Sequence, residues 1–164
     1  MMKNLLGLAY FIALVILSHV IGERLPRKWF DYTKYPFASF RWERDGDLYD
    51  KIHIKKWKKK LPDLSRVMKR MVPKKVVFRS SSSEIDLLLR ELCVAETVHI
   101  ALCVLSFGVL IFARTWFCVV LSILYSFGNI PFILIQRYNR PHIMRLFFRV
   151  KAMEEEALKQ KTIE

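Results

Sequence analysis

The chain has 164 residues and a mass of 19.5 kDa, which is room for one domain. Hydrophobic residues make up 53% of it, yet its formal net charge is +13 and its mean hydropathy is +0.19. The aromatic content of 13% excludes a disordered chain, and three scattered cysteines exclude a disulfide scaffold and a zinc ribbon. Apolar residues gather in long runs, with the basic residues between them. We therefore expect an all-α integral membrane protein, a single membrane domain over residues 1–164. It should have about three transmembrane helices and basic amphipathic helices at the interface.

Three apolar runs are candidates for the membrane spans. The run 5–22 contains no charge and is long enough for a helix to cross the hydrocarbon core. A cleaved signal peptide is the alternative, but the exit of this run is a poor small-x-small site and a basic segment follows. The runs 97–113 and 115–135 are separated only by Arg114. A tight helical hairpin and a re-entrant pair that never crosses are both open, and the near-spanning length of each run favours the hairpin.

Positive charge predicts the orientation of these spans. The segment 23–92 carries 19 of the 28 Lys and Arg residues, and the part after Ile135 carries seven. Basic loops stay on the cytoplasmic side of a membrane. We therefore expect a multi-pass protein of the cell membrane, with the basic segment and the C-terminus cytoplasmic and the N-terminus and Arg114 outside.

Residues 23–83 interleave aromatic and basic side chains, which a solvated linker would not do. Such segments lie in the headgroup layer, where rings sit at the interface and Lys and Arg meet anionic lipid. Four prolines interrupt this interfacial segment, so its helices should be short, and Asp45-Gly46-Asp47 predicts a turn. The basic run 55–60 would suit nucleic acid on its own. Because membrane runs flank it, we expect membrane lipids as its partners and no nucleic acid.

The next helix should begin at a capping box, either Ser81 with Glu84 or Ser83 with Asp86. From there a single long helix over 84–113 should include the second membrane span, and its first turns should project into the cytoplasm or the interface.

Glu96 and His99 lie three residues apart in this long helix and share one face. Ionisable groups at the mouth of a span are costly unless they are paired or functional. A histidine held by a carboxylate suits general-base catalysis on a hydroxyl group. The same spacing is half of a di-metal site, but the chain has no second copy, so no metal is expected. A third possibility is a purely structural pair.

Two arginines, an asparagine and a histidine crowd the exit of the third span, residues 136–142. They are either an anchor on the cytoplasmic side, with Pro141 ending the helix, or an anion pocket for the phosphate of CoA, a carrier protein or a glycolipid. Within the span, Asn129 is expected to bond across helices. The tail 136–164 reads as a basic amphipathic helix whose last residues, from Glu154 onward, are frayed.

Four groups of residues resemble the motifs of a known protein family. They are Ser39-Phe40 with Glu43 and Gly46; Lys56-Trp57-Lys58-x-Lys60-Leu61-Pro62-Asp63; Ala95-Glu96-x-x-His99; and Gln136-Arg137-Tyr138-Asn139-Arg140-Pro141. With the chain length and the order of the apolar runs, they resemble the glycosyl-4,4'-diaponeurosporenoate acyltransferase family. These are the small membrane enzymes that end the staphyloxanthin carotenoid pathway. The resemblance covers roughly residues 20 to 145, and the Gln-Arg-Tyr-Asn-Arg-Pro string is its most specific part.

The resemblance implies transfer of a fatty acyl chain to a sugar hydroxyl of a glycosylated lipid, of carotenoid type or another. The chain has neither the His-x-x-x-x-Asp motif of glycerolipid acyltransferases nor a Gly-x-Ser-x-Gly elbow. Direct attack by the acceptor hydroxyl is therefore expected. No cofactor is expected beyond an acyl donor such as acyl-CoA or acyl carrier protein as co-substrate.

The resulting hypothesis assigns each candidate residue a role in a membrane O-acyltransferase. His99, oriented by Glu96, would deprotonate the acceptor hydroxyl at the cytoplasmic interface. Arg137 and Arg140 would bind the donor phosphate or steady the oxyanion, with Asn139 as a neutral donor. The remaining substrate-binding candidates, which would hold the headgroup and position the sugar, are Glu43, Lys56, Trp57 and Lys58. The alternative is a non-catalytic lipid-binding or accessory subunit of a larger membrane complex, and a homo-oligomer fits either hypothesis.

Overall fold

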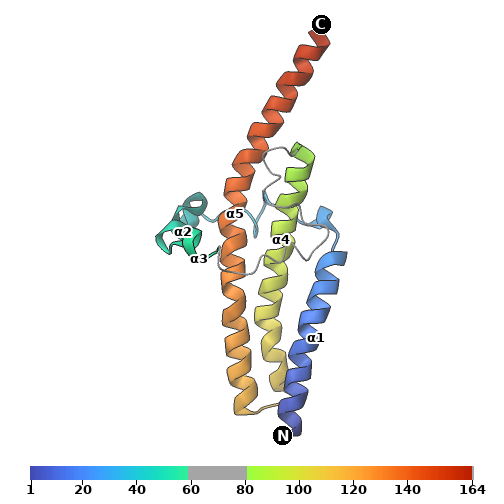
Figure 1. Ribbon diagram of the computed structural model, residues 1–164, viewed down its shortest axis with the longest axis vertical. Coiled ribbons are helices and arrows are strands. Elements are labelled where there is room, and N and C mark those ends of the chain that lie inside the picture. The colour runs from blue at the N-terminus through green and yellow to red at the C-terminus, as the bar shows by residue number, and fades with distance from the viewer. Residues whose placement is uncertain (59–80, 164) are drawn as a thin grey trace. The chain divides into compact units, whose positions relative to one another are not determined.

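The computed structural model describes residues 1–58 and 81–163, and all of the regular structure in these ranges is helical (Figure 1). The all-α prediction is therefore confirmed. The long elements are α1 (Met2–Arg24), α4 (Ser82–Leu105), the 3-10 helix η5 (Ser106–Ile111) that continues α4, and α5 (Trp116–Ile163). The short ones are the 3-10 helices η1 (Arg27–Trp29) and η2 (Arg41–Gly46) and the helices α2 (Asp47–Lys51) and α3 (Ile54–Trp57).

In the part of the chain that the structure describes, three helices are long and apolar enough to cross a membrane, as the three apolar runs predict. They are Met2–Arg24, Ser82–Ile111 and Trp116–Thr162, and only 22%, 28% and 22% of their most apolar windows are buried inside the protein. Large apolar side chains of α1 such as Leu5, Ile12 and Ile16 are more than half exposed. A lipid environment would cover this apolar surface, since in water it would cost free energy in proportion to its area.

The described chain divides into two compact units. The first unit comprises residues 1–26 and 94–136, and the second comprises the described parts of 27–93 and 137–164. The short helices predicted for the interfacial segment, which prolines interrupt, all belong to the second unit.

The core of the first unit forms where α1, the α4–η5 helix and the first half of α5 lie side by side (Figure 1). Hydroxyl groups join the three helices across this core. Tyr10 donates to the carbonyl oxygen of Leu105 at 2.7 Å, and Ser122 donates to that of Ser106 at 2.9 Å. The buried residues of the core are Phe11, Leu14, Leu102, Val109, Ala113 and Cys118.

The helix expected over 84–113 changes from an α-helix to a 3-10 helix near its end. The α-helix stops at Leu105 and continues as the 3-10 helix η5. The carbonyl groups of Leu105 and Ser106 accept hydroxyl groups from Tyr10 and Ser122, and Ser106 Oγ donates to the carbonyl of Cys103 at 2.8 Å. Side-chain donors thus compete here with the backbone bonds of an α-helix.

A short turn at residues 112–115 joins η5 to α5, as a helical hairpin requires. Arg114 lies in this turn and its Nε donates to the carbonyl oxygen of Leu110 at 3.2 Å. Thr115 caps α5, because its Oγ1 accepts the backbone N–H of Cys118 at 3.3 Å. The turn has the form that the hairpin interpretation predicts.

Gly7 lets α1 approach α5 closely. A Cβ atom at Gly7 would lie 2.6 Å from Sγ of Cys118, a residue that is fully buried. We therefore expect Gly7→Ala to destabilise the first unit by about 1–3 kcal/mol, the usual cost of overpacking. Thermal unfolding in detergent measures this, and Gly128→Ala is the matched control because nothing lies within 4 Å of its Cβ position. Equal losses for the two variants would contradict the close packing of α1 on α5.

The start of α4 in the second unit confirms one of the two predicted capping boxes. Ser81 Oγ accepts the backbone N–H of Glu84 at 3.4 Å, and Glu84 Oε2 accepts that of Ser81 at 3.1 Å. The helix therefore begins at Ser82, slightly before the expected position. The backbone N–H of Ser82 donates to Oε1 of Glu154 at 2.9 Å, which places a carboxylate at the positive end of the helix dipole.

The second unit also corrects two expectations about the C-terminal part. Pro141 does not end a helix, and the residues after Glu154 are not frayed, because α5 runs on to Ile163. Pro141 is buried and packs against Gly46, where its Cγ lies 3.4 Å from the position of a Cβ atom. Proline lacks the backbone N–H that would continue the hydrogen bonds of the helix, and packing contacts such as this one offset that loss. Beyond it, good helix formers and the bond from Ser82 to Glu154 support the last turns.

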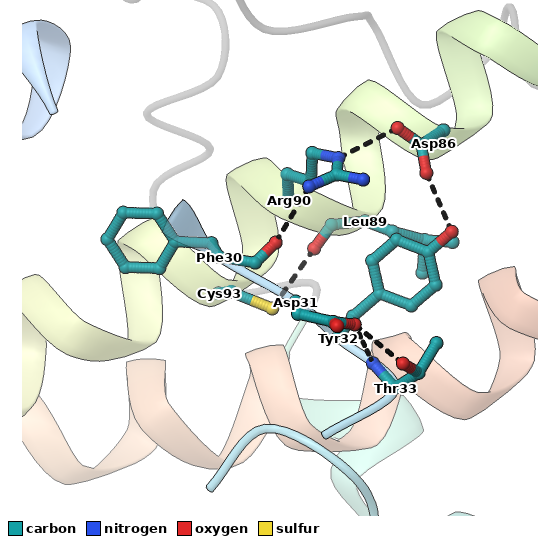
Figure 2. Close-up of polar contacts among 8 residues, drawn as sticks. All are labelled: Phe30, Asp31, Tyr32, Thr33, Asp86, Leu89, Arg90 and Cys93. Atoms are coloured by element: carbon teal, nitrogen blue, oxygen red, sulfur yellow. Dashed lines mark hydrogen bonds and ion pairs between the residues drawn. The ribbon is translucent and has the colours of Figure 1, made fainter. Parts of the chain in front are cut away.

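A polar network attaches the chain after η1 to α4 within the second unit. Tyr32 donates to Oδ1 of Asp86 at 2.7 Å, while Arg90 donates to Oδ2 of Asp86 at 2.8 Å and to the carbonyl of Phe30 at 3.2 Å (Figure 2). Arg27 adds a two-pronged pair with Glu91, at 2.7 and 2.9 Å. Burial and the bond to Asp86 raise the pKa of Tyr32, so its hydroxyl keeps its proton and stays a donor at neutral pH.

Candidate functional site

The second unit contains all of the predicted substrate-binding residues, and one of them, the buried carboxylate of Glu43, is bonded by another, Arg137. Glu43 belongs to η2, and its side chain is 2% exposed. Arg137 of α5 donates to it from Nε at 2.5 Å and from Nη2 at 2.9 Å. Tyr49 of α2 donates its hydroxyl to the same carboxylate, and the backbone N–H of Phe40 donates at 2.8 Å. Glu43 and Arg137 therefore hold each other, although 94 positions separate them in the sequence.

The electrostatics of this cluster keep Glu43 charged. Burial by itself would raise the pKa of Glu43, but the bonds from Arg137, Tyr49 and the Phe40 backbone outweigh it and lower that pKa. Burial, together with the bond to Glu43, raises the pKa of Tyr49. At neutral pH the cluster is thus a carboxylate, a guanidinium and a neutral phenol. The sequence assigns no role to Tyr49, because nothing in it distinguishes Tyr49 from the other aromatic residues of the interfacial segment.

Backbone geometry explains why this turn can wrap around Glu43. Arg44, Asp45 and Gly46 all have positive φ angles, of 48°, 52° and 102°. Gly46 is buried against Pro141 and His142 of α5, and its φ favours glycine over any other residue. The turn predicted from Asp45-Gly46-Asp47 is confirmed.

Arg140 is as buried as Glu43. It is 2% exposed and donates from Nη1 to the carbonyl oxygen of Phe37. The guanidinium of Arg137 also reaches the Pro36 carbonyl, at 3.3 Å, and lies 4.5 Å from the centre of the Phe40 ring. Both arginines of the Gln-Arg-Tyr-Asn-Arg-Pro string thus hold the chain 36–43 against α5.

Lys58 and Asn139 meet beside this cluster. The ammonium of Lys58 donates to Oδ1 of Asn139 at 3.1 Å and lies 4.4 Å from the centre of the Tyr138 ring. Trp57 is partly buried and donates from Nε1 to the Ile52 carbonyl at 3.0 Å, whereas Lys56 is exposed. The remaining positions of the Lys-Trp-Lys string, from Lys59 to Asp63, lie outside the described residues.

The other predicted pair, Glu96 and His99, lies on α4 in the first unit. Glu96 is 2% exposed. Nδ1 of His99 lies 2.8 Å from Oδ1 of Asn129 on α5, and the imidazole stacks on Phe132 with ring centres 4.8 Å apart and planes 10° from parallel. The predicted bond of Asn129 across helices is confirmed, and its partner is His99.

His99 differs from the three other histidines of the chain. His19 is half exposed and pairs with Glu23 at 3.6 Å. His53 is exposed, in the left-handed region at φ 53°. His142 is exposed and donates from Nδ1 to the carbonyl of Tyr138 on its own helix, at 2.9 Å. Within residues 1–58 and 81–163, His99 alone among the four is fixed by side chains of a neighbouring helix, as an oriented proton acceptor should be.

The described residues contain no group of three or more His, Cys, Asp or Glu side chains that could hold a metal ion. The first unit offers an imidazole, and the second offers basic side chains near a buried ion pair.

Comparison with known proteins assigns the family. A family model described as "Glycosyl-4,4'-diaponeurosporenoate acyltransferase" matches residues 26–149. Proteins of that name from Staphylococcus aureus strains bovine RF122 / ET3-1 and N315 are each 28% identical over 162 residues, which covers 94% of this chain and 96% of theirs. No solved structure matches the chain. Because the family model covers most of the sequence, the chain belongs to the glycosyl-4,4'-diaponeurosporenoate acyltransferase family.

Proposed function

We propose that this protein transfers a fatty acyl chain from an acyl thioester to a sugar hydroxyl of a glycosylated lipid at the cytoplasmic face of the cell membrane. The observation that carries the proposal is the family match over residues 26–149, which spans both Glu43–Arg137 and His99. The named acceptor of the relatives, a glycosyl-4,4'-diaponeurosporenoate, is the first acceptor to test. Acyl-CoA and acyl carrier protein are the two donors proposed.

In this proposal His99 is the general base. Its imidazole takes the proton of the acceptor hydroxyl as the hydroxyl oxygen attacks the thioester carbonyl carbon. The oxyanion then collapses, the carbon–sulfur bond breaks, and the leaving thiolate takes the proton back from the imidazolium. An ester and a free thiol result, so no further reactant is needed. The contacts of His99 with Asn129 and Phe132 support this role, because they fix the ring.

The geometry of the second unit refines the roles proposed for the binding residues. Arg137 and Arg140 are occupied by Glu43 and backbone carbonyls, so we propose that they shape the site. Lys56 is exposed, so we propose that it meets an anionic group of the donor or of a lipid, with Trp57 and the Lys58–Asn139 pair as its neighbours in the site. An ammonium is a suitable point charge for a phosphate.

Membrane insertion supports the choice of a lipid acceptor. The three apolar helices would place the protein in the acyl-chain region of a bilayer, where a lipid acceptor lies. The excess of Lys and Arg in residues 23–92 and after Ile135 favours a cytoplasmic position for both parts. Anionic lipid would add to the binding of this basic segment.

Reconstitution tests the proposal. The purified full chain, in vesicles that contain a glycosyl-4,4'-diaponeurosporenoate, is given either acyl-CoA or acyl carrier protein loaded with the same fatty acid. Mass spectrometry should show an acceptor that has gained one acyl group with at least one donor. A glycolipid with the sugar hydroxyls blocked is the control acceptor and should gain none. No acylated product with either donor would contradict the proposal.

A further inference from the structure

The pair of His99 and Asn129 fixes where the proton of the imidazole resides. The amide nitrogen of Asn129 donates to the carbonyl oxygen of Tyr125, one turn earlier in α5, at 2.8 Å. This bond fixes the orientation of the Asn129 amide, because only its NH₂ group can donate to the carbonyl oxygen of Tyr125. Oδ1 of Asn129 therefore faces His99 as an acceptor at 2.8 Å. For a bond to exist there, Nδ1 of His99 must carry the proton.

A neutral imidazole has one ring N–H and one lone pair. If Nδ1 carries the proton, Nε2 carries the lone pair. Phe132 restricts the ring further, since the two planes lie 10° from parallel with centres 4.8 Å apart. Asn129 and Phe132 are three residues apart on α5, so they share a helix face and act on the same ring.

We infer that Asn129 is a positioning residue, which holds His99 in the Nδ1–H tautomer so that Nε2 is the atom that takes the acceptor proton. This inference rests on the proposed acyl transfer for its catalytic meaning, whereas the tautomer itself is a property of the resting protein. The neutral amide replaces the carboxylate that often orients a catalytic histidine. An amide achieves this without adding a further charge beside Glu96 in the spans, where charge is costly.

Nitrogen NMR on the full chain with ¹⁵N-labelled histidine, in lipid nanodiscs at a pH where the ring is neutral, tests the tautomer without any activity. The His99→Ala spectrum assigns the His99 signals. The wild-type protein should show a protonated Nδ1 and a pyridine-like Nε2. Asn129→Leu should shift the population toward Nε2–H, whereas Asn129→Asp keeps an acceptor oxygen and should retain Nδ1–H. Ser122→Ala is the matched control, because it removes another bond between these helices, to the Ser106 carbonyl.

Kinetics of the same variants tests the positioning role. Asn129→Leu should lower kcat by about 10²-fold with KM nearly unchanged. The substrate still binds, but Nε2 of His99 is no longer held as the proton acceptor. Ser122→Ala should keep kcat. A wild-type Nε2–H tautomer would overturn the inference, as would an Asn129→Leu variant with unchanged tautomer or unchanged kcat. If wild type shows Nδ1–H but His99→Ala is fully active, the proposed base is wrong while the tautomer assignment stands.

Discussion

His99→Ala should lower the rate of acyl transfer by about 10²- to 10⁴-fold, the usual contribution of a general base. In the contacts among the described residues, this imidazole is the only one of the four that side chains of a neighbouring helix fix in place. Its loss removes the proton acceptor and leaves the binding groups of the second unit unchanged. We therefore expect kcat to fall and KM for both substrates to stay within a few-fold. Initial rates with reconstituted protein measure both.

Two histidine controls make this test specific. His19→Ala removes an exposed imidazole on α1 and should keep the wild-type rate. His142→Ala tests the rival base, because His142 is exposed and its Nδ1 donates to the Tyr138 carbonyl. Loss of transfer in His142→Ala, together with a normal rate in His99→Ala, would contradict the assignment of the base.

Removal of either partner of the Glu43–Arg137 pair should destabilise the second unit by about 3–5 kcal/mol, because the other charge is left buried without its partner. The side chains are 2% and 9% exposed and are joined by bonds of 2.5 and 2.9 Å. The double variant Glu43→Ala with Arg137→Ala should lose much less than the sum of the single variants. Thermal unfolding in detergent, followed for all four members of the cycle, measures the coupling.

The exposed pair of Asp50 and Lys55 is the control for this cycle. Its bond of 2.9 Å equals the longer of the two Glu43–Arg137 bonds, but its side chains are 40% and 63% exposed. We expect Asp50→Ala to change stability by no more than about 1 kcal/mol, the range of surface ion pairs. If the losses of stability in Glu43→Ala and Arg137→Ala were additive and no larger than the loss in Asp50→Ala, burial would not strengthen the pair and the prediction would be wrong.

The pH dependence of stability should follow from the same pair. The pKa of Glu43 in the folded protein is below its ordinary value of 4.5, so the unfolded chain binds a proton at Glu43 first as the pH falls. The stabilisation is complete above about pH 4.5 and is lost as the pH falls through the lowered folded pKa. Glu43→Gln should remove this part of the acid sensitivity. A wild-type acid profile in that variant would mean that other carboxylates set it.

The sequence predicts elements whose signals are local. The apolar runs give α1, the α4–η5 helix and the first half of α5, and Ser81 with Glu84 gives the start of α4. Pro141 shows the limit of such signals. Its local preference is to end a helix, but contacts of its neighbours with the chain 36–43 carry α5 through it.

The partners of the candidate residues depend on how helices are rotated against each other, which no periodicity states. Asn129 is recognisable as a polar group in a span, but only the packing of α5 on α4 shows that it faces His99. Arg137 suggests an anion site in the sequence, and the fold supplies the anion from within the chain, as Glu43. The arginine string is therefore recognisable as important before its role is.

Lipid analysis of cells tests the central claim most directly. Total lipids are compared by mass spectrometry in cells that make the wild-type protein, His99→Ala, His19→Ala or none, in a host that makes glycosyl-4,4'-diaponeurosporenoate. The account predicts a glycolipid heavier by one acyl group with wild type and His19→Ala, and little or none with His99→Ala at equal protein level. Identical lipid profiles with and without the wild-type protein would contradict acyl transfer to this acceptor.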